Sequence, residues 1–366
     1  MRRLVLVLAL AAAACGGGGG AAGGRPRAPA LPPAHPEAVT KLARGVVLAR
    51  EPGGVPRAIE VLREAVSKDP NLWEARYDLG VLLADTGDLA GAEEQLEAAL
   101  ELAPNAEDVV VALGEVRRRR SDPRGAAAAL EPFVKAHPDA FTARVALVSA
   151  LREAGRIAEA IQHAQAVLVR RANDPSALAE LALAHLERGE TDTAELLSQE
   201  SLKAEPRTAA AERTAGLVAL ARGDDAVAFQ HFVRASELDP KDTTARLNMG
   251  TVLLQAGVHA QAEKQFRAVL AVEPGAVPAQ LGLAAALRGQ GTKQRAEPWQ
   301  EAEKILQGVL ERDPNNLAGL YNLAVLYLES LGRPADAKPL LERFLTQAPT
   351  AHPAREDAKS KLAGIR

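Results

Sequence analysis

The chain has 366 residues and a formal net charge of −3, which argues against general nucleic-acid binding because that function needs a basic footprint. Its single cysteine excludes an internal disulfide. Only six Phe, three Tyr and two Trp occur, so thin layers of paired helices are favoured over a bulky globular core.

The first 14 residues have the pattern of a secretory signal peptide. Arg2 and Arg3 precede the apolar run Leu4 to Ala14. This run is much shorter than the ~20 residues that a helix needs to span a bilayer. We therefore expect residues 1–14 to be a signal peptide rather than a membrane anchor.

The only cysteine, Cys15, follows this leader directly after three alanines. Small residues before a cysteine resemble the lipobox of bacterial lipoproteins, although Ala12 stands where that family prefers leucine. The resemblance implies that Cys15 becomes the lipidated first residue and anchors the protein to a membrane. The alternative is ordinary cleavage after an Ala-x-Ala site, which would leave a free thiol in a soluble protein.

Residues 15–36 have the composition of a tether. Gly16 to Gly20 is pure glycine, and Arg25 to Pro36 is rich in proline and alanine without apolar periodicity. About 20 such residues have a root-mean-square reach on the order of 25 Å. Similarity to the sorting of bacterial lipoproteins implies the outer membrane, because Gly16 rather than aspartate follows Cys15, and the rest of the chain would then lie in the periplasm.

Alanine recurs at a fixed interval of 34 residues and continues after two short insertions. A second ladder of prolines lies twelve residues behind it. The alanines are Ala58, Ala92, Ala126, Ala160, Ala194, Ala228, Ala262, Ala302 and Ala337, and the prolines are Pro70, Pro104, Pro138, Pro206, Pro240, Pro274, Pro314 and Pro349. A period of 34 is the signature of stacked helical hairpins.

Each interval predicts two helices. An apolar stripe surrounds each alanine, as with Phe232 and Ala235, and a second stripe upstream pairs a large residue with a small one, as in Met249-Gly250. The small residue lets the two helices approach closely. The proline then blocks continuation of the second helix.

This pattern resembles the tetratricopeptide family, with leucine-glycine and tyrosine in the first helix and alanine, phenylalanine, alanine and proline in or after the second. The resemblance implies an all-α, right-handed solenoid of about nine repeats over residues 37–350. Residues 351–366 read as a capping helix. Such arrays bind other proteins and seldom perform chemistry.

No residue pattern indicates catalysis, a metal site or a cofactor. Seven scattered histidines form no HExxH motif, and neither a CxxC pair nor a phosphate-binding glycine loop occurs. Nine repeats leave no room for a catalytic domain, so we expect a protein that is not an enzyme.

The resemblance also implies a binding surface, because ligands of the family usually lie in a concave groove lined by the first helix of each repeat. The corresponding positions are charged in the first half of this chain, as at Glu74 and Asp78. In the last third they are mainly apolar or carry amides and hydroxyls: Leu247, Asn248, Thr251, Leu254, Leu281, Tyr321, Asn322, Val325 and Leu328. We expect a peptide or helix of another envelope protein to bind there, with Leu247, Tyr321 and Val325 partly exposed. The alternative is that these residues pack against neighbouring helices or the capping helix.

Lipoproteins of this layout resemble components of the myxobacterial adventurous gliding-motility apparatus, type IV pilus pilotins and outer-membrane assembly lipoproteins. The resemblance implies a membrane-anchored scaffold of an envelope machine. A soluble secreted or periplasmic adaptor for an enzyme of cell-wall or polysaccharide processing remains the alternative. The sequence does not indicate the oligomeric state.

Overall fold

The computed structural model describes residues 33–365, and these residues form helices joined by turns, with one isolated bridge between Thr292 and Arg295. The expected signal peptide, Cys15 and most of the expected tether lie outside the described residues. The chain divides into two compact units after Gly189.

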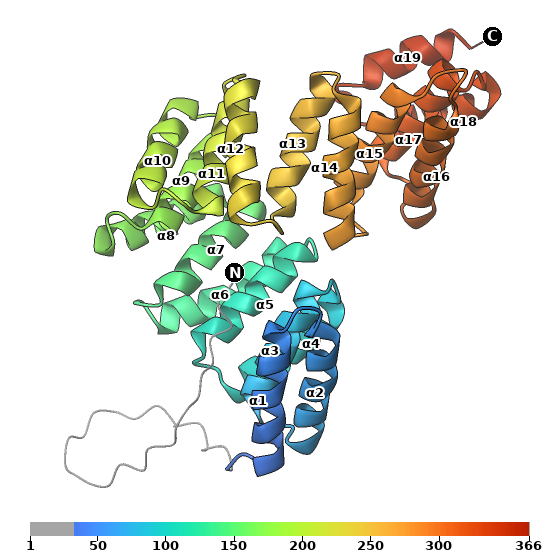
Figure 1. Ribbon diagram of the computed structural model, residues 1–366. Helices are drawn as coiled ribbons and strands as arrows, with labels where there is room; N and C mark the ends of the chain where they lie inside the picture. The colour runs from blue at the N-terminus through green and yellow to red at the C-terminus, as the bar shows by residue number, and fades with distance from the viewer. Residues whose placement is uncertain (1–32, 366) are drawn as a thin grey trace, which may run out of the picture. The chain divides into compact units, whose positions relative to one another are not determined.

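The first unit contains nine helices in its described part (Figure 1). They are α1 (Pro36–Arg50), α2 (Val55–Lys68), α3 (Trp73–Asp85), α4 (Leu89–Leu102), α5 (Glu107–Arg119), α6 (Pro123–Ala136), α7 (Phe141–Glu153), α8 (Ile157–Arg170) and α9 (Pro175–Glu187). Each helix packs against the next one in the chain, and α3, α5, α7 and α9 also contact one another in that order.

The second unit repeats this arrangement. Its helices are α10 (Thr191–Ala204), α11 (Ala209–Ala221), α12 (Asp225–Leu238), α13 (Thr243–Gln255), α14 (His259–Val272), α15 (Val277–Gln290), α16 (Glu297–Arg312), α17 (Leu317–Val325), α18 (Pro334–Gln347) and α19 (Arg355–Ala363), with the π-helix η1 (Leu326–Ser330) continuing α17. Again α13, α15 and α17 contact one another in order.

The alanine ladder lies where helices meet. All nine ladder alanines, from Ala58 to Ala337, are completely buried. Glycines upstream of several ladder alanines have a related role. A Cβ atom added to Gly250 on α13 would lie 2.7 Å from Cε1 of Phe266 on α14. The close approach that the sequence predicts at Gly250 is therefore confirmed.

Turns between the paired helices use left-handed backbone at the same interval of 34 residues. Gly87 has φ of 89° and Gly155 has φ of 77°, and Ser121 takes the intervening position with φ of 63°. Because glycine adopts this conformation without a steric penalty, the turn follows directly from the sequence at most positions.

The π-helix η1 accommodates a change in the repeat length. Ala302 and Ala337 are 35 residues apart, one more than the regular interval. The N–H of Leu331 donates to the carbonyl of Leu326, five residues earlier, at 3.0 Å. A π-bulge inserts one residue into a helix without ending it, so the ladder keeps its alignment.

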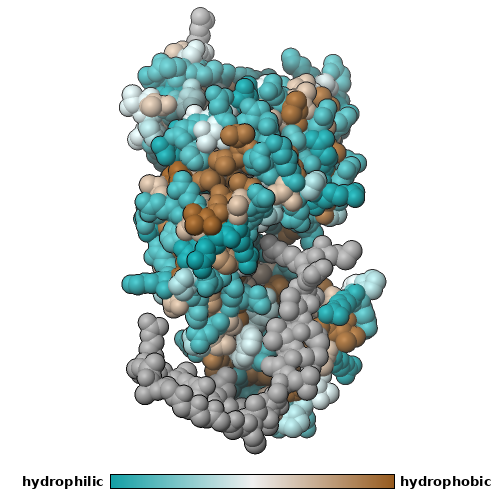
Figure 2. All heavy atoms as spheres, turned by 90° about the vertical axis from the view of Figure 1, so that its left-hand side faces the viewer, coloured by the Kyte–Doolittle hydropathy of each residue, from teal (hydrophilic) through white to brown (hydrophobic). Residues whose placement is uncertain are grey.

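Hydrophilic residues cover most of the face shown in Figure 2, and apolar residues gather in smaller patches. The large apolar side chains that are exposed among residues 33–365 are Val39, Val47, Val169, Leu196, Val227 and Val258. None belongs to the binding surface predicted from the sequence.

Candidate partner-binding surface

The nine groove positions predicted in the last third of the chain all lie in the second unit. Four are on α13, one on α15, three on α17 and one on η1. We call the face that they share the odd-helix face, because it belongs to the odd-numbered helices α13, α15 and α17 with η1.

On α13 and α15 the odd-helix face is accessible. Leu247, Leu254 and Leu281 are half-buried and pack against the hydrophobic core, while Thr251 between them is exposed. The Asn248 amide donates to the carbonyl of Thr244 at 2.9 Å. One of its two N–H donors is therefore engaged within its own helix.

On α17 the expected exposure of Val325 is wrong, because this side chain is only 5% exposed and belongs to the core. Tyr321 is half-buried, its ring centroid lies 5.5 Å from that of Phe344, and its hydroxyl donates to Oδ2 of Asp357 on α19. Leu328 also packs against the core. The capping helix therefore covers part of the surface that the sequence assigns to a ligand.

A chain of charged groups holds α19 against this surface. Glu329 at the end of η1 pairs with Arg288 of α15 at 2.9 Å and with Lys361 of α19 at 2.5 Å. Lys361 also lies 3.6 Å from Asp357. Asn322 lines a cavity of about 10 Å³ together with Ala285 and Arg288, a space that holds at most one water molecule.

In the first unit, the corresponding face carries a ladder of ion pairs. Arg118 of α5 pairs with Glu115 and with Glu153 of α7. Arg152 of α7 pairs with Glu180 and Glu187 of α9. Burial disfavours the charged form of each guanidinium, but the carboxylates around it raise its pKa. Both guanidiniums of this part of the face are therefore engaged, and because four carboxylates surround two cations, a net negative charge remains.

The basic cluster of residues 117 to 120 is neutralised in a similar way. Arg117 pairs with Glu93 and Glu97, and Arg120 also pairs with Glu93. The cluster therefore completes contacts between α4 and α5.

Asp78, on the helix that precedes these ion pairs on the same face, has no such partner. Asp78 on α3 is 7% exposed, and no hydrogen bond or ion pair engages it within the described chain. Burial, with a contribution from the charge of Glu74, raises the pKa of Asp78 from 3.8 to about 7. The sequence places Asp78 at a groove position but does not reveal its burial, because a charged residue on a helix surface is ordinarily solvated.

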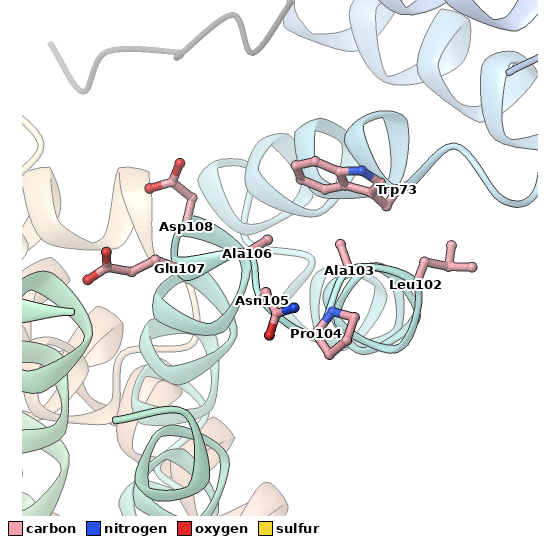
Figure 3. Close-up of a pocket in the computed structure, with 8 residues that line it drawn as sticks. All are labelled: Trp73, Leu102, Ala103, Pro104, Asn105, Ala106, Glu107 and Asp108. Carbon is pink, nitrogen blue, oxygen red and sulfur yellow. The ribbon is translucent and has the colours of Figure 1, made fainter. Parts of the chain in front are cut away.

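A pocket of about 470 Å³ lies near the start of α3, between Trp73 and the connection from α4 to α5 (Figure 3). Trp73 faces Ala103 and Pro104, and the side chains of Glu107 and Asp108 point away from it (Figure 3). Glu107 is already engaged, because it accepts a hydrogen bond from the backbone N–H of Ala143 at 2.8 Å. The pocket therefore presents mainly apolar surface.

Residues 33–365 contain no cluster of three or more side chains suited to holding a metal ion. No helix among them is both long enough and apolar enough to cross a bilayer.

Among solved structures, the chain is similar to a chain of the APC/C hetero-tetramer Cut9–Hcn1, with 15% identity and a TM-score of 0.64. That match covers 89% of this chain and 62% of the other, so this chain spans less than two thirds of its length. A tetratricopeptide repeat protein from Parabacteroides merdae matches with 18% identity and a TM-score of 0.44, covering 80% of this chain and 97% of that one. YrrB, described as having an unusual peptide-binding site, matches with 18% identity and a TM-score of 0.38, covering 53% of this chain and 97% of YrrB. No curated protein matches the sequence.

Family models give the decisive comparison. A model described as a tetratricopeptide repeat matches residues 46–107, 111–177, 179–243 and 247–303, and a second of the same description matches residues 295–362. Proteins built from these repeats generally mediate protein–protein interactions, bind peptides or other proteins in a groove and are typically non-catalytic scaffolds. The chain belongs to the tetratricopeptide repeat family.

Proposed function

We propose that this protein is a non-enzymatic scaffold that is anchored to a bacterial membrane by lipid on Cys15 and holds partner proteins of an envelope machine. The observation that carries the proposal is the order of features along the chain. A leader ends at the only cysteine, a glycine- and proline-rich segment follows, and tetratricopeptide repeats fill most of the remainder.

The anchor belongs to the outer membrane in this proposal, on its periplasmic face, because Gly16 rather than aspartate follows Cys15. The machine is of the gliding-motility or type IV pilus type. Support for this assignment is the resemblance in layout to lipoproteins of such machines, and the partner is another envelope protein.

Binding of one partner segment is assigned to the open part of the odd-helix face on α13 and α15. Leu247, Leu254 and Leu281 supply apolar contact area there, and Thr251 is the exposed residue among them. Apolar contact at the centre of an interface carries much of a binding energy. Tyr321 and Val325 are assigned to the fold instead, because Tyr321 contacts α19 and Val325 is buried in the core.

The lipid anchor is tested by Cys15→Ser in the producing bacterium. Fatty-acid labelling should disappear and the protein should leave the membrane fraction, because tethering depends on the acyl chains. Ala22→Ser in the same segment is the control and should change neither measurement. An unlabelled wild-type protein in the soluble fraction would instead favour the soluble adaptor for a cell-wall or polysaccharide-processing enzyme.

The partner surface is tested by affinity purification from detergent-solubilised envelopes with Thr251→Glu. This change places a charge on the apolar face without opening the core, so co-purifying proteins should be lost while the melting temperature changes by only a few degrees. Val227→Glu, at an exposed position of α12, is the matched control. Retention of every co-purifying protein by Thr251→Glu would exclude this surface.

A further inference from the structure

Three acidic side chains are buried among residues 33–365, and Asp78 alone of the three has no partner. Asp242 pairs with Arg213 at 2.5 Å and accepts the N–H of Ala245 at 2.9 Å. Glu212 receives hydrogen bonds or ion pairs from His231 at 2.7 Å and Arg234 at 3.1 Å. A buried carboxylate without such a partner carries an uncompensated desolvation cost.

Asp78 lies at the edge of the buried side of α3. It is buried like Ala75 and Leu82, each of which is one turn away from it on the helix. Glu74 lies one turn before Asp78 and Asp85 two turns after it, on the side of α3 that includes the groove positions of this repeat. The carboxylates of Glu74 and Asp78 therefore share this side of α3.

Glu74 is half-buried and forms no ion pair. Burial raises its pKa, as it does that of Asp78, while a hydrogen bond with its own backbone opposes the shift. Two neighbouring carboxylates on one helix thus have little access to solvent and no ion pair.

No positive side chain of the neighbouring repeats balances this pair. Arg118 and Arg152 are committed to the glutamates around them, as described above. Arg76 on α3 itself donates to the carbonyl of Pro70 at 2.8 Å and to Gln95 at 3.0 Å. The described part of the chain, residues 33–365, therefore supplies no positive group that neutralises Asp78.

The chemistry of the pair selects the kind of cation. Calcium requires six to eight oxygen ligands, whereas this site offers two carboxylates and no cluster of three metal-binding side chains exists among the described residues. An ammonium or guanidinium group needs only one or two acceptors and forms strong hydrogen bonds with carboxylates.

We propose that Asp78 and Glu74 form a receptor site for a lysine or arginine side chain of the protein segment that binds this scaffold. The inference rests on the partner-binding part of the proposed function and not on the lipid anchor. In this proposal the first unit binds a basic segment of a partner, whereas the second unit offers an apolar surface.

The test measures binding of a fluorescent oligolysine peptide to the purified full-length protein by anisotropy at physiological salt. Asp78→Asn and Glu74→Gln should each weaken binding by about tenfold, because each removes one acceptor of a partly buried charged pair. Asp85→Asn removes the same charge from an exposed position of α3 and should weaken binding by less than about twofold.

Two controls keep the outcome interpretable. Melting curves should show Asp78→Asn to be at least as stable as the wild type, so lost binding would not reflect unfolding. Oligoglutamate of the same length should not bind. Equal losses from Asp78→Asn and Asp85→Asn would mean diffuse attraction and would overturn the proposal, as would the absence of saturable oligolysine binding.

The same measurement on Cys15→Ser separates this site from the proposed anchor. Loss of membrane attachment with unchanged oligolysine binding would show that the receptor site does not depend on the lipid anchor. Conversely, a failed oligolysine titration leaves the labelling of Cys15 and the Thr251→Glu purification unaffected.

Discussion

Asp78 shows how a single residue can oppose folding and serve binding. Its burial without a partner makes the ionised form costly in the folded protein, which is why its pKa rises to about 7. Residues of this kind persist in proteins when function compensates for the lost stability. The cost should be visible as a dependence of stability on pH.

We expect Asp78→Asn to increase the free energy of unfolding, relative to the wild type, more at pH 8 than at pH 4. The unfolded carboxyl ionises near 3.8 and the folded one near 7, so the wild type loses stability as pH rises between these values and the loss is complete above 7. The difference should reach a few kcal/mol, at about 1.4 per unit of pKa. Urea unfolding at several pH values measures it.

The outcome that contradicts this account is a constant difference between the two proteins across the pH range. Asp85→Asn serves as the reference for removing one carboxylate from α3 at an exposed position. Its difference from the wild type should stay small and vary little with pH.

Residue identity predicted the interior better than it predicted the surface. Ala58 and Phe266 lie in the core as the repeat pattern indicates, because the periodic positions alone determine which side of a helix faces its partner. The exposure of Val325 could not be predicted in this way. The exposure of Val325 depends on how α17 and η1 pack against other helices, and the pattern within a single repeat does not reveal that packing.

At the scale of helices, paired glycines determine how closely neighbours pack. Phe266 of α14 lies between Gly250 of α13 and Gly282 of α15, and a Cβ added at Gly282 would lie 2.5 Å from the Phe266 ring. Phe266 is 1% exposed and cannot move aside freely. Gly308 on α16 has no atom within 4 Å of an added Cβ.

Alanine should therefore have opposite effects at two helical glycines. Gly282→Ala should destabilise the protein by about 1–3 kcal/mol through overpacking, whereas Gly308→Ala should stabilise it by about 0.5–1 kcal/mol because alanine favours the helix. Thermal or urea unfolding measures both. Combining Gly282→Ala with Phe266→Leu should recover part of the loss, and destabilisation by Gly308→Ala would contradict the packing described for α16.

The capping helix illustrates what an element contributes beyond its own sequence. The expectation of a helix near the C-terminus agrees with α19, which begins at Arg355. The sequence allows Tyr321 either to face a ligand or to pack against the capping helix, and the structure supports packing. The repeat pattern identifies the positions that face outward, but only the three-dimensional arrangement shows which of them α19 covers.

At the scale of the whole molecule, two units each have a core of their own. One cluster of buried residues in the first unit extends from Ala58 on α2 to Val116 on α5. Another in the second unit extends from Leu253 on α13 to Ala358 on α19. Because repeats couple mainly to their nearest neighbours, damage at one end of the array should remain local.

A chain that ends at Pro353 tests this locality. Loss of α19 removes the buried Ala358 and the hydrogen-bond acceptor of Tyr321, so amide hydrogen exchange should increase in α17 and α18 and much less from α1 to α5. Lys359→Ala on α19 is the control, because Lys359 is exposed and its ion pair is with Glu356 of the same helix. Exchange that rises equally in both units would show that the array unfolds as a single cooperative block. The effects of variants on α3, α13 and α15 would then have to be compared with their effects on the stability of the whole protein before a local role is assigned.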